Sequence, residues 1–182
     1  MMSLMEAAIA TGGTALNGNP RIEGVSTDTR TLASGELYVA LKGERFDGHT
    51  FLARAIELGA SAVLVDARAT LPHEVMPPEV TVLRVTDTLV ALGALARFHR
   101  ERLESEGALR LVVAITGSVG KTTTKEMCAA VLEGLGHRVT RTIGNLNNRI
   151  GVPLTIFAAS LEDTALVLEM GMNVPGEIAL MA

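Results

Sequence analysis

Aromatic residues and cysteine are scarce in this sequence. Tryptophan is absent, and four phenylalanines with one tyrosine make up only 3% of the 182 positions. Hydrophobic residues still reach 48%, so a core is possible, but it must be built mainly from Leu, Val, Ile, Ala and Met. The single cysteine, Cys128, excludes an internal disulfide framework. Because it lies within a predicted helix, we interpret Cys128 as a packing residue rather than a nucleophile.

Long hydrophobic runs and an excess of one charge are also absent. No apolar run approaches the ~20 residues that a membrane span needs, and the N-terminus lacks the pattern of a secretory signal. The net charge is −4, and no basic stripe is present that would favour nucleic acid. We therefore expect a cytoplasmic protein, monomeric, without a membrane span and without a nucleic-acid partner.

What is present centres on residues 111–126, LVVAITGSVGKTTTKE. The apolar run Leu111–Ile115 predicts a buried strand of a parallel sheet. Two glycines follow it at once, and Lys121 then opens a predicted helix. The helix is indicated by apolar residues at helical spacing and by glycines that close it: Met127, Ala130, Val131, Leu135, Gly134 and Gly136.

A strand, a glycine loop, Lys-Thr and a helix form the arrangement that binds nucleoside triphosphates, because backbone N–H groups and the helix N-terminus converge on phosphate oxygens. Lys121 is the predicted catalytic residue, since it can reach the β- and γ-phosphates, and the Thr122 hydroxyl can ligate Mg²⁺. An ordinary glycine turn is the alternative. Ile115 replaces the first glycine of the common pattern, which disfavours an unrelated P-loop kinase. The residues predicted to bind ATP are Gly117, Ser118, Val119, Gly120, Lys121, Thr122 and Thr123.

The first hundred residues predict a small α/β domain. A capping box at residues 3–6 opens a helix that should end at Gly12-Gly13. Strands are predicted at 37–41, 62–65 and 80–85, helices at 51–58 and from Asp87 onward, and a proline-containing loop at 71–79. The polar segment 104–107 suggests a boundary, giving one domain over residues 1–106 and the start of a second over 107–182.

Two polar loops in that first domain allow two interpretations. Ser26–Arg30 has five consecutive hydrogen-bonding side chains, and Lys42–His49 is polar and punctuated by glycine. Each is either a capped surface turn or the polar rim of a ligand site, and side-chain chemistry alone does not decide between them. His49 and His99 have no second ligand at metal spacing, so we expect them at the surface or on helix flanks.

The second domain continues with a strand at 137–142 and the asparagine-rich run GNLNNR at 144–149. This run is either a loop of asparagine turns or a polar clamp at the carboxyl edge of the sheet. A helix is predicted beyond Pro153, a third strand at 165–168, and a further helix from 175. Glu169 follows the third strand, where a Mg²⁺ carboxylate is expected, so Thr122 and Glu169 should lie within roughly 5 Å of each other.

Several separated runs resemble the Mur ligase family, the ATP-dependent amide ligases that build the peptide of bacterial cell-wall precursors. TGSVGKTTT at 116–124 is similar to the family's ATP loop, and VSTDTR at 25–30 and LYVALKGERFDGH at 37–49 are similar to its UDP-binding domain. The runs KTTTKEM, GNLNNRIGVP and LEMGMNVPGEI favour the branch that adds a dipeptide. The resemblance implies a small N-terminal α/β domain followed by the start of a P-loop-type parallel-sheet ATPase domain.

That resemblance implies ATP and Mg²⁺ as cofactors, and UDP-N-acetylmuramoyl-tripeptide and D-alanyl-D-alanine as substrates. Family members continue past residue 182 into the rest of the ATPase domain and a C-terminal domain, so this chain alone is expected to be inactive. Another Mur ligase, a folylpolyglutamate synthase or a non-catalytic nucleotide-binding module are the alternatives. The implied substrate-binding residues are Thr27, Thr29, Arg30, Glu44, Arg45, Phe46, Asn145, Asn147 and Asn148.

Overall fold

The computed structural model describes residues 1–43, 46–69 and 80–181. The chain has the predicted α/β fold, and its contacts cluster into two compact units, Met1–Leu95 and Ala96–Ala182. This division falls inside helix α3 (Thr88–Ser105). The domain boundary predicted near residue 106, just after that helix, stays a prediction. The loop predicted at 71–79 lies outside the described residues.

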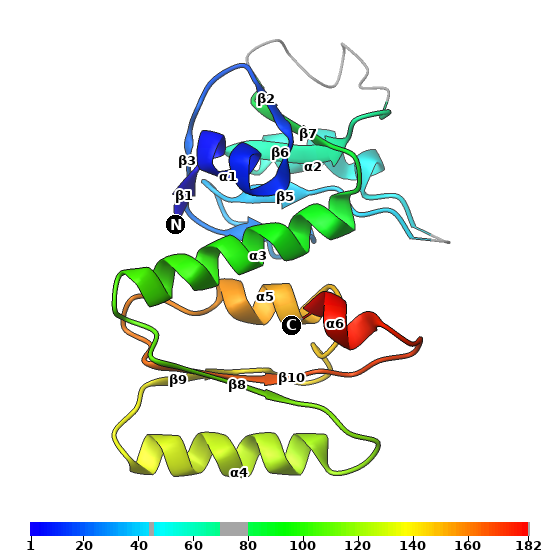
Figure 1. Cartoon of the computed structure of the whole chain (residues 1–182). Helices are drawn as coiled ribbons and strands as arrows, with labels where there is room; N and C mark the ends of the chain where they lie inside the picture. The colour runs from blue at the N-terminus through cyan, green and yellow to red at the C-terminus, as the bar shows by residue number, and fades with distance from the viewer. Residues whose placement is uncertain (44–45, 70–79, 182) are drawn as a thin grey trace. The chain divides into compact units, whose positions relative to one another are not determined.

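The first unit contains a five-stranded sheet in the order β2-β7-β6-β5-β4 (Figure 1). All its neighbouring strands are parallel except β2, which pairs antiparallel with β7. β1 and β3 form a separate antiparallel pair. The elements before α3 are β1 (Met2–Ser3), α1 (Leu4–Thr11), β2 (Thr14–Leu16), β3 (Arg21–Ile22), β4 (Val25–Ser26), β5 (Leu37–Val39), the 3₁₀-helix η1 (Gly48–Phe51), α2 (Leu52–Glu57), β6 (Ala62–Asp66) and β7 (Val82–Val85).

The ends of the helices follow the predicted capping chemistry. The Ser3 side chain accepts from the Glu6 amide while the Glu6 carboxylate accepts from Ser3 N–H, and Gly12 ends α1 in the left-handed conformation with φ of 63°. The Asp87 carboxylate caps α3 by accepting from the amides of Leu89 and Val90. The predicted capping box of α1 and the Asp87 cap are therefore confirmed.

The second unit contains a parallel three-stranded sheet in the order β8-β10-β9. All five residues of the central strand β10 are buried. Figure 1 shows α4 on one face of this sheet and α5 on the other. Because the strands are parallel, their carboxyl ends meet at one edge. The elements after α3 are β8 (Leu111–Ile115), α4 (Lys121–Gly134), β9 (Val139–Arg141), α5 (Gly151–Phe157), β10 (Ala165–Glu169) and α6 (Glu177–Met181).

One burial prediction for this unit is wrong. β8 is not a buried strand, because it pairs with β10 alone among the described strands, and Leu111 is 37% exposed. Helix α4 is present as predicted, but the apolar residues that indicated it, including Val131, are exposed, and Ala129 and Leu132 pack on the sheet instead. The helix carries apolar residues on both sides, so periodicity alone could not identify the side that faces β10.

Two further details differ from prediction. Helix α5 starts at Gly151 rather than after Pro153, because a proline in the first turn lacks only an N–H that has no partner there. Of the two positions expected for His99, the surface is wrong: the residue lies on helix α3 and is buried, and its Nε2 lies 2.9 Å from the Ala159 carbonyl oxygen. Burial is the main cause that lowers the pKa of His99.

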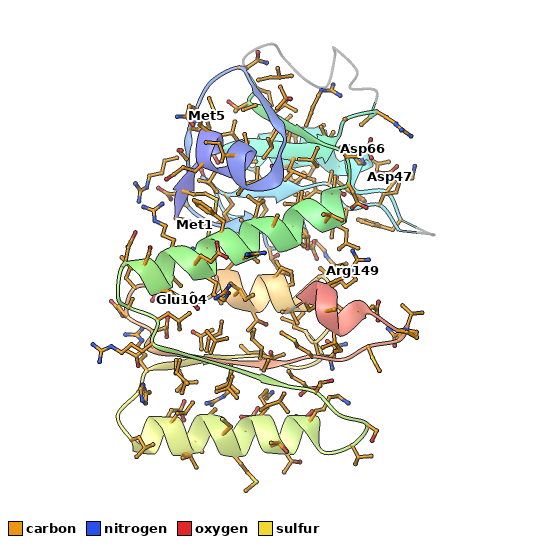
Figure 2. The ribbon with its side chains drawn as sticks, in the orientation of Figure 1. Met1, Met5, Asp47, Asp66, Glu104 and Arg149 are labelled. Atoms are coloured by element: carbon orange, nitrogen blue, oxygen red, sulfur yellow. The ribbon has the colours of Figure 1, made fainter. Side chains whose placement is uncertain are left out.

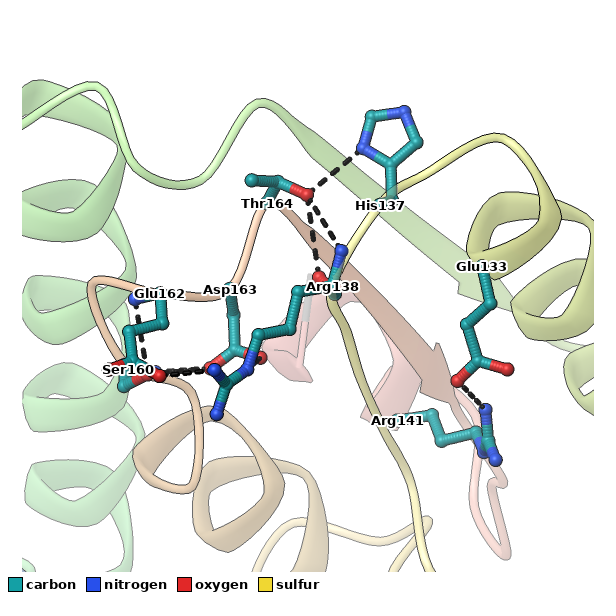
Figure 3. A network of polar contacts seen from close by, with 8 residues as sticks. All are labelled: Glu133, His137, Arg138, Arg141, Ser160, Glu162, Asp163 and Thr164. Atoms are coloured by element: carbon teal, nitrogen blue, oxygen red, sulfur yellow. Dashed lines mark hydrogen bonds and ion pairs between the residues drawn. The ribbon is translucent and has the colours of Figure 1, made fainter.

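A polar network secures the amino edge of the same sheet (Figure 3). The Thr164 hydroxyl accepts from the Arg138 amide at 3.1 Å and lies 3.1 Å from His137 Nδ1. The Ser160 hydroxyl donates to the Asp163 carboxylate at 2.9 Å, and Arg138 pairs with Glu162. These contacts tie the starts of β9 and β10 together, which fixes their register and leaves the opposite edge to the phosphate loop.

Candidate functional site

The glycine loop connects β8 to α4 at the carboxyl edge of the sheet. Gly117 has φ of 154° and Gly120 has φ of 79°, a left-handed conformation that a side chain would strain. Among the residues that the structure describes, no side chain caps the start of α4, so the N–H groups of its first turn are available to an anion. Lys121 Nζ donates to the Gly117 carbonyl at 2.7 Å, which holds the lysine beside the loop. The predicted strand–loop–helix geometry is therefore present.

Glu169 lies at the predicted position beside that loop. It is only 3% exposed, and each of its carboxylate oxygens accepts one hydrogen bond, from the Thr122 hydroxyl at 2.8 Å and from Asn147 Nδ2 at 2.9 Å. The predicted proximity of Thr122 and Glu169 is confirmed, because β8 and β10 are adjacent parallel strands. A hydroxyl and a carboxylate at this distance are oxygen donors of the kind that Mg²⁺ prefers.

The asparagine-rich loop reaches the same place, but its members differ in their contacts. The side-chain oxygen of Asn148, Oδ1, accepts hydrogen bonds from the backbone amides of Ile150 and Gly151 at 3.0 and 2.8 Å. This side chain therefore caps α5. The backbone carbonyl oxygen of Asn147 accepts a hydrogen bond from the Gly171 amide at 2.7 Å. A Cβ at position 171 would come within 3.3 Å of the Asn147 side chain, so glycine allows this close approach. Asn147 and Asn148 therefore have structural contacts of their own.

These segments enclose a pocket of about 760 Å³, which we call the loop pocket. It brings together the phosphate loop, the asparagine loop and a segment after β10, part of the run LEMGMNVPGEI, in which no site residue after Glu169 was predicted. The signal for that segment was its place, since it directly follows a strand that ends at the ligand edge. The loop pocket is lined by Thr116, Gly117, Ser118, Lys121, Asn145, Asn147, Asn148, Gly171, Met172, Asn173 and Ile178.

Four residues predicted to bind ATP do not line the loop pocket: Thr122, whose hydroxyl bonds Glu169, and three others. Val119 is 88% exposed at the tip of the loop, Gly120 is the N-cap of α4, and Thr123 lies in the first turn of that helix. Their backbone N–H groups, rather than their side chains, are the parts that a phosphate loop uses. Their binding roles stay predictions.

The first unit has a second pocket of about 450 Å³, which we call the aromatic pocket. The rings of Phe46 and Phe51 are stacked with centroids 5.7 Å apart. The two polar loops of this domain meet here, because residues 27–30 and Phe46 face the same space. Glu44 and Arg45 lie outside the described residues. The aromatic pocket is lined by Thr27, Asp28, Thr29, Arg30, Tyr38, Phe46 and Phe51.

Arg30 braces its own loop. Its guanidinium donates to both Asp28 carboxylate oxygens, with Nε at 3.0 Å from each and Nη2 at 2.5 Å from one. These hydrogen bonds lower the pKa of Asp28 to about 2. The Ser26 hydroxyl donates to the Asp28 carbonyl at 3.1 Å, which closes the turn. The segment is thus a braced turn that also lines a pocket. This geometry is compatible with both interpretations of the sequence, the capped turn and the rim of a ligand site.

Tyr38 was not predicted as a site residue. It is the only tyrosine, is buried in β5, and donates its hydroxyl to the Gly48 carbonyl at 3.1 Å. Burial, with the charges of Asp28 and Asp47, raises its pKa to about 12. Three of the five aromatic residues line this pocket, and such clustering in an aromatic-poor chain was the available signal.

His49 has a structural role between two acidic residues, Asp47 and Asp66, both labelled in Figure 2. Its Nε2 accepts from the Asp66 amide at 3.1 Å, so the proton lies on Nδ1, which donates to Asp47 at 2.7 Å. Within the described ranges, no three or more side chains of His, Cys, Asp or Glu form a group that could hold a metal ion. No helix in the described part of the chain is long and apolar enough to cross a membrane.

Two family models match the chain. The Mur ligase family catalytic domain matches residues 21–100, and the Mur ligase middle domain matches residues 115–182. The UDP-N-acetylmuramoyl-tripeptide–D-alanyl-D-alanine ligase of Bacillus subtilis (strain 168) is 47% identical over 161 residues, which is 88% of this chain and 33% of the relative. The ligase of the same name from Escherichia coli (strain K12) is 46% identical over 158 residues, or 87% of this chain and 32% of the relative.

Solved structures agree with these sequence matches. A structure of MurF from Acinetobacter baumannii has a TM-score of 0.82 at 35% identity, covering 99% of this chain and 38% of that one. MurF from Thermotoga maritima, solved in complex with ADP, has a TM-score of 0.70 at 34% identity, covering 87% of this chain and 34% of that one. The chain spans about a third of the length of the curated relatives it matches. Two matched domains, these identities and the observed α/β fold show that the chain belongs to the Mur ligase family.

Proposed function

We propose that this chain supplies the nucleotide-binding and UDP-substrate-binding parts of an ATP-dependent ligase that joins D-alanyl-D-alanine to UDP-N-acetylmuramoyl-tripeptide. The observation that carries the proposal is the loop pocket, where a phosphate loop and an asparagine cluster meet, together with the buried carboxylate of Glu169 that Thr122 and Asn147 bond beside it. The names of the relatives supply the substrates. As its sequence predicts, we place the reaction in the cytoplasm and the chain as a monomer.

In the loop pocket, ATP is the phosphoryl donor. Backbone N–H groups from Gly117 to the first turn of α4 hold the phosphates, and the Lys121 ammonium leaves the Gly117 carbonyl to pair with the β- and γ-oxygens. The complex of a relative with ADP supports this assignment. Phosphoryl transfer depends chiefly on such positioning and charge neutralisation, so no covalent nucleophile is required.

Thr122 and Glu169 are the residues that would hold Mg²⁺. Their oxygens lie 2.8 Å apart, both are hard donors, and the carboxylate is buried beside the phosphate loop, so the pair fits this ion. When bound, Mg²⁺ neutralises charge on the phosphate oxygens. Asn147, which lines the loop pocket, donates to the second oxygen of Glu169 and so fixes the orientation of the carboxylate.

In the aromatic pocket, we propose that the uridine diphosphate part of the substrate binds. Phe46 is 48% exposed and offers a ring face on which uracil can stack, and the Thr27 and Thr29 hydroxyls can bond the base or ribose. Arg30 braces the turn, as its bonds to Asp28 support. Glu44 and Arg45 remain part of this proposal by their place in the sequence.

The reaction proceeds in two balanced steps. The terminal carboxylate of the tripeptide attacks the γ-phosphorus of ATP, the bond to the β-phosphate oxygen breaks, and an acyl phosphate and ADP result. The amine of D-alanyl-D-alanine then attacks the acyl carbon, inorganic phosphate leaves, and the amine loses its proton as the amide forms. Asn145 and Asn148 line the pocket where the tripeptide end would meet the phosphates.

A chimeric enzyme tests this function. The present chain would replace the matching third of the Escherichia coli relative, and phosphate release would be measured with the tripeptide substrate and either D-alanyl-D-alanine or single amino acids as acceptors. We expect turnover with the dipeptide, and loss of turnover when Lys121→Ala is introduced. Turnover with a diamino acid on a shorter UDP-peptide would point to another Mur ligase. ATP binding without any ligation would favour a non-catalytic module.

A further inference from the structure

A second lysine of the phosphate-loop helix is buried. Lys125 is 2% exposed and faces the sheet from the second turn of α4. Its Nζ donates to the Thr142 carbonyl at 2.7 Å and lies 2.9 Å from a carboxylate oxygen of Glu126. Burying an ammonium group is costly, and a methionine could cover the same apolar surface of the sheet. Packing alone therefore does not account for a charge at this position.

Thr142 links this lysine to the proposed metal site. It is 1% exposed and follows strand β9, where its amide donates to the Val167 carbonyl at 3.0 Å. Its hydroxyl accepts from the backbone amide of Glu169 at 2.9 Å. Lys125 and Glu169 thus hold opposite parts of the same threonine, the carbonyl and the hydroxyl.

The contacts form a closed ring. Thr122 lies one turn before Lys125 on α4, and its hydroxyl donates to the Glu169 carboxylate at 2.8 Å. The helix is therefore joined to the ends of β9 and β10 at two points, once through Thr122 and once through Lys125 and Thr142. Two attachments one turn apart fix both the rotation and the height of a helix start relative to a sheet.

We propose that Lys125 is a positioning residue, which through Thr142 keeps the Thr122 hydroxyl and the Glu169 carboxylate at the spacing that receives a divalent cation. The inference rests on the proposed function for the identity of the cation, Mg²⁺. The mechanical link between α4 and β10 does not depend on the proposed function. Lys125 itself is not among the residues that line the loop pocket.

Lys125→Met tests the proposal, because it keeps the length of the side chain and removes the charge. ADP affinity would be measured by calorimetry on the 182-residue chain, with saturating Mg²⁺ and with EDTA. We expect affinity in EDTA to change less than twofold, while the enhancement by Mg²⁺ falls about tenfold. The Glu169 amide should also exchange its hydrogen at least about tenfold faster without ligand, since its acceptor Thr142 is released.

Glu126→Gln is the matched control. It removes the exposed ion-pair partner but leaves the bond from Lys125 to Thr142, so both readouts should stay within about twofold of the original. Thr142→Val removes only the hydroxyl and should reproduce the loss of Mg²⁺ enhancement. If Lys125 acts through Thr142, the double variant should lose no more than either single variant.

Each outcome decides the question. Unchanged Mg²⁺ enhancement and unchanged Glu169 exchange in a folded Lys125→Met variant would overturn the proposal. If that variant does not fold, Thr142→Val decides, because unchanged enhancement there would also overturn it. If the original chain binds no ADP, the proposed function fails, and the exchange measurement alone then decides whether Lys125 positions Glu169.

Discussion

The loop pocket and the aromatic pocket are built in opposite ways. The loop pocket depends on backbone groups and on a carboxylate, Glu169, whose two oxygens are already hydrogen-bonded and whose side chain is 3% exposed. The aromatic pocket depends on an exposed ring, Phe46, beside a turn that satisfies its own charges through Asp28 and Arg30. Under the proposed function, the first pocket would hold a multiply charged group, and the second would stack a flat one.

This difference predicts separable effects, since charge-assisted hydrogen bonds are stronger than exposed stacking contacts. Variants in the loop pocket should change nucleotide affinity and turnover by large factors. Variants in the aromatic pocket should change UDP affinity by smaller ones. Each variant should leave the other ligand unaffected.

Lys121→Ala is expected to have the largest effect. Loss of a charge-assisted contact to phosphate should weaken ATP binding about 10- to 150-fold, corresponding to roughly 1.5–3 kcal/mol, and lower ligation by the chimera about a thousandfold. Calorimetry and phosphate release measure the two quantities. Arg138→Ala, at the opposite edge of the same sheet, is the matched control. A comparable loss of UDP-substrate affinity would contradict the separation.

Phe46→Ala should have the next largest effect, on the other ligand. Loss of a stacking surface should weaken UDP binding about tenfold, or roughly 1–1.5 kcal/mol, with ATP affinity unchanged. Tyr38 fluorescence reports the occupancy of the pocket, because the chain has one tyrosine and no tryptophan. Phe98→Ala, outside the pocket lining, is the control. An unchanged UDP titration for both Phe46→Ala and Thr29→Ala would return the loops to solvated turns.

Asn148→Ala sharpens the comparison within the loop pocket by separating stability from binding. The variant lacks the side-chain oxygen that accepts hydrogen bonds from two backbone amides at the start of α5. The free energy of unfolding should therefore fall by about 1 kcal/mol. Asn145→Ala lines the same pocket and should change stability by less than about 0.5 kcal/mol. Urea unfolding of the two variants measures this difference. Equal stability of both variants would show that the cap contributes nothing.

Arg30→Ala should have the smallest effect on binding and a clear effect on titration. The pKa of Asp28 should rise from about 2 toward its ordinary value of 3.8 in a carboxyl NMR titration. Because the folded-state pKa is the lower one, the stabilisation is present above 3.8 and is lost as the pH falls through about 2. At pH 7, UDP affinity should change less than twofold. A tenfold loss there would mean that Arg30 touches the diphosphate.

The sequence by itself determined the local structure and one complete motif. Capping chemistry set the ends of α1 and α3, since Ser3, Glu6 and Asp87 bond to amides within three residues of themselves. The order strand, glycine loop, Lys-Thr, helix requires no distant residue, so the phosphate loop was predicted with its bounds. The place of Glu169 followed as well, because adjacent parallel strands end at one edge.

Only the tertiary structure decided which apolar faces are covered and which polar groups meet. Helix α4 has apolar residues on both sides, and its contact with β10, rather than its periodicity, buries Ala129 and Leu132. Lys125, Thr142 and Glu169 are separated by many residues, so no local pattern could show that they share hydrogen bonds. The place of Tyr38 in the aromatic pocket could not be predicted for the same reason, since β5 sets its ring beside one loop that precedes the strand in sequence and one that follows it. Hydrogen bonds between residues close in sequence can be predicted from those residues, whereas burial and long-range contacts exist only once the strands have paired.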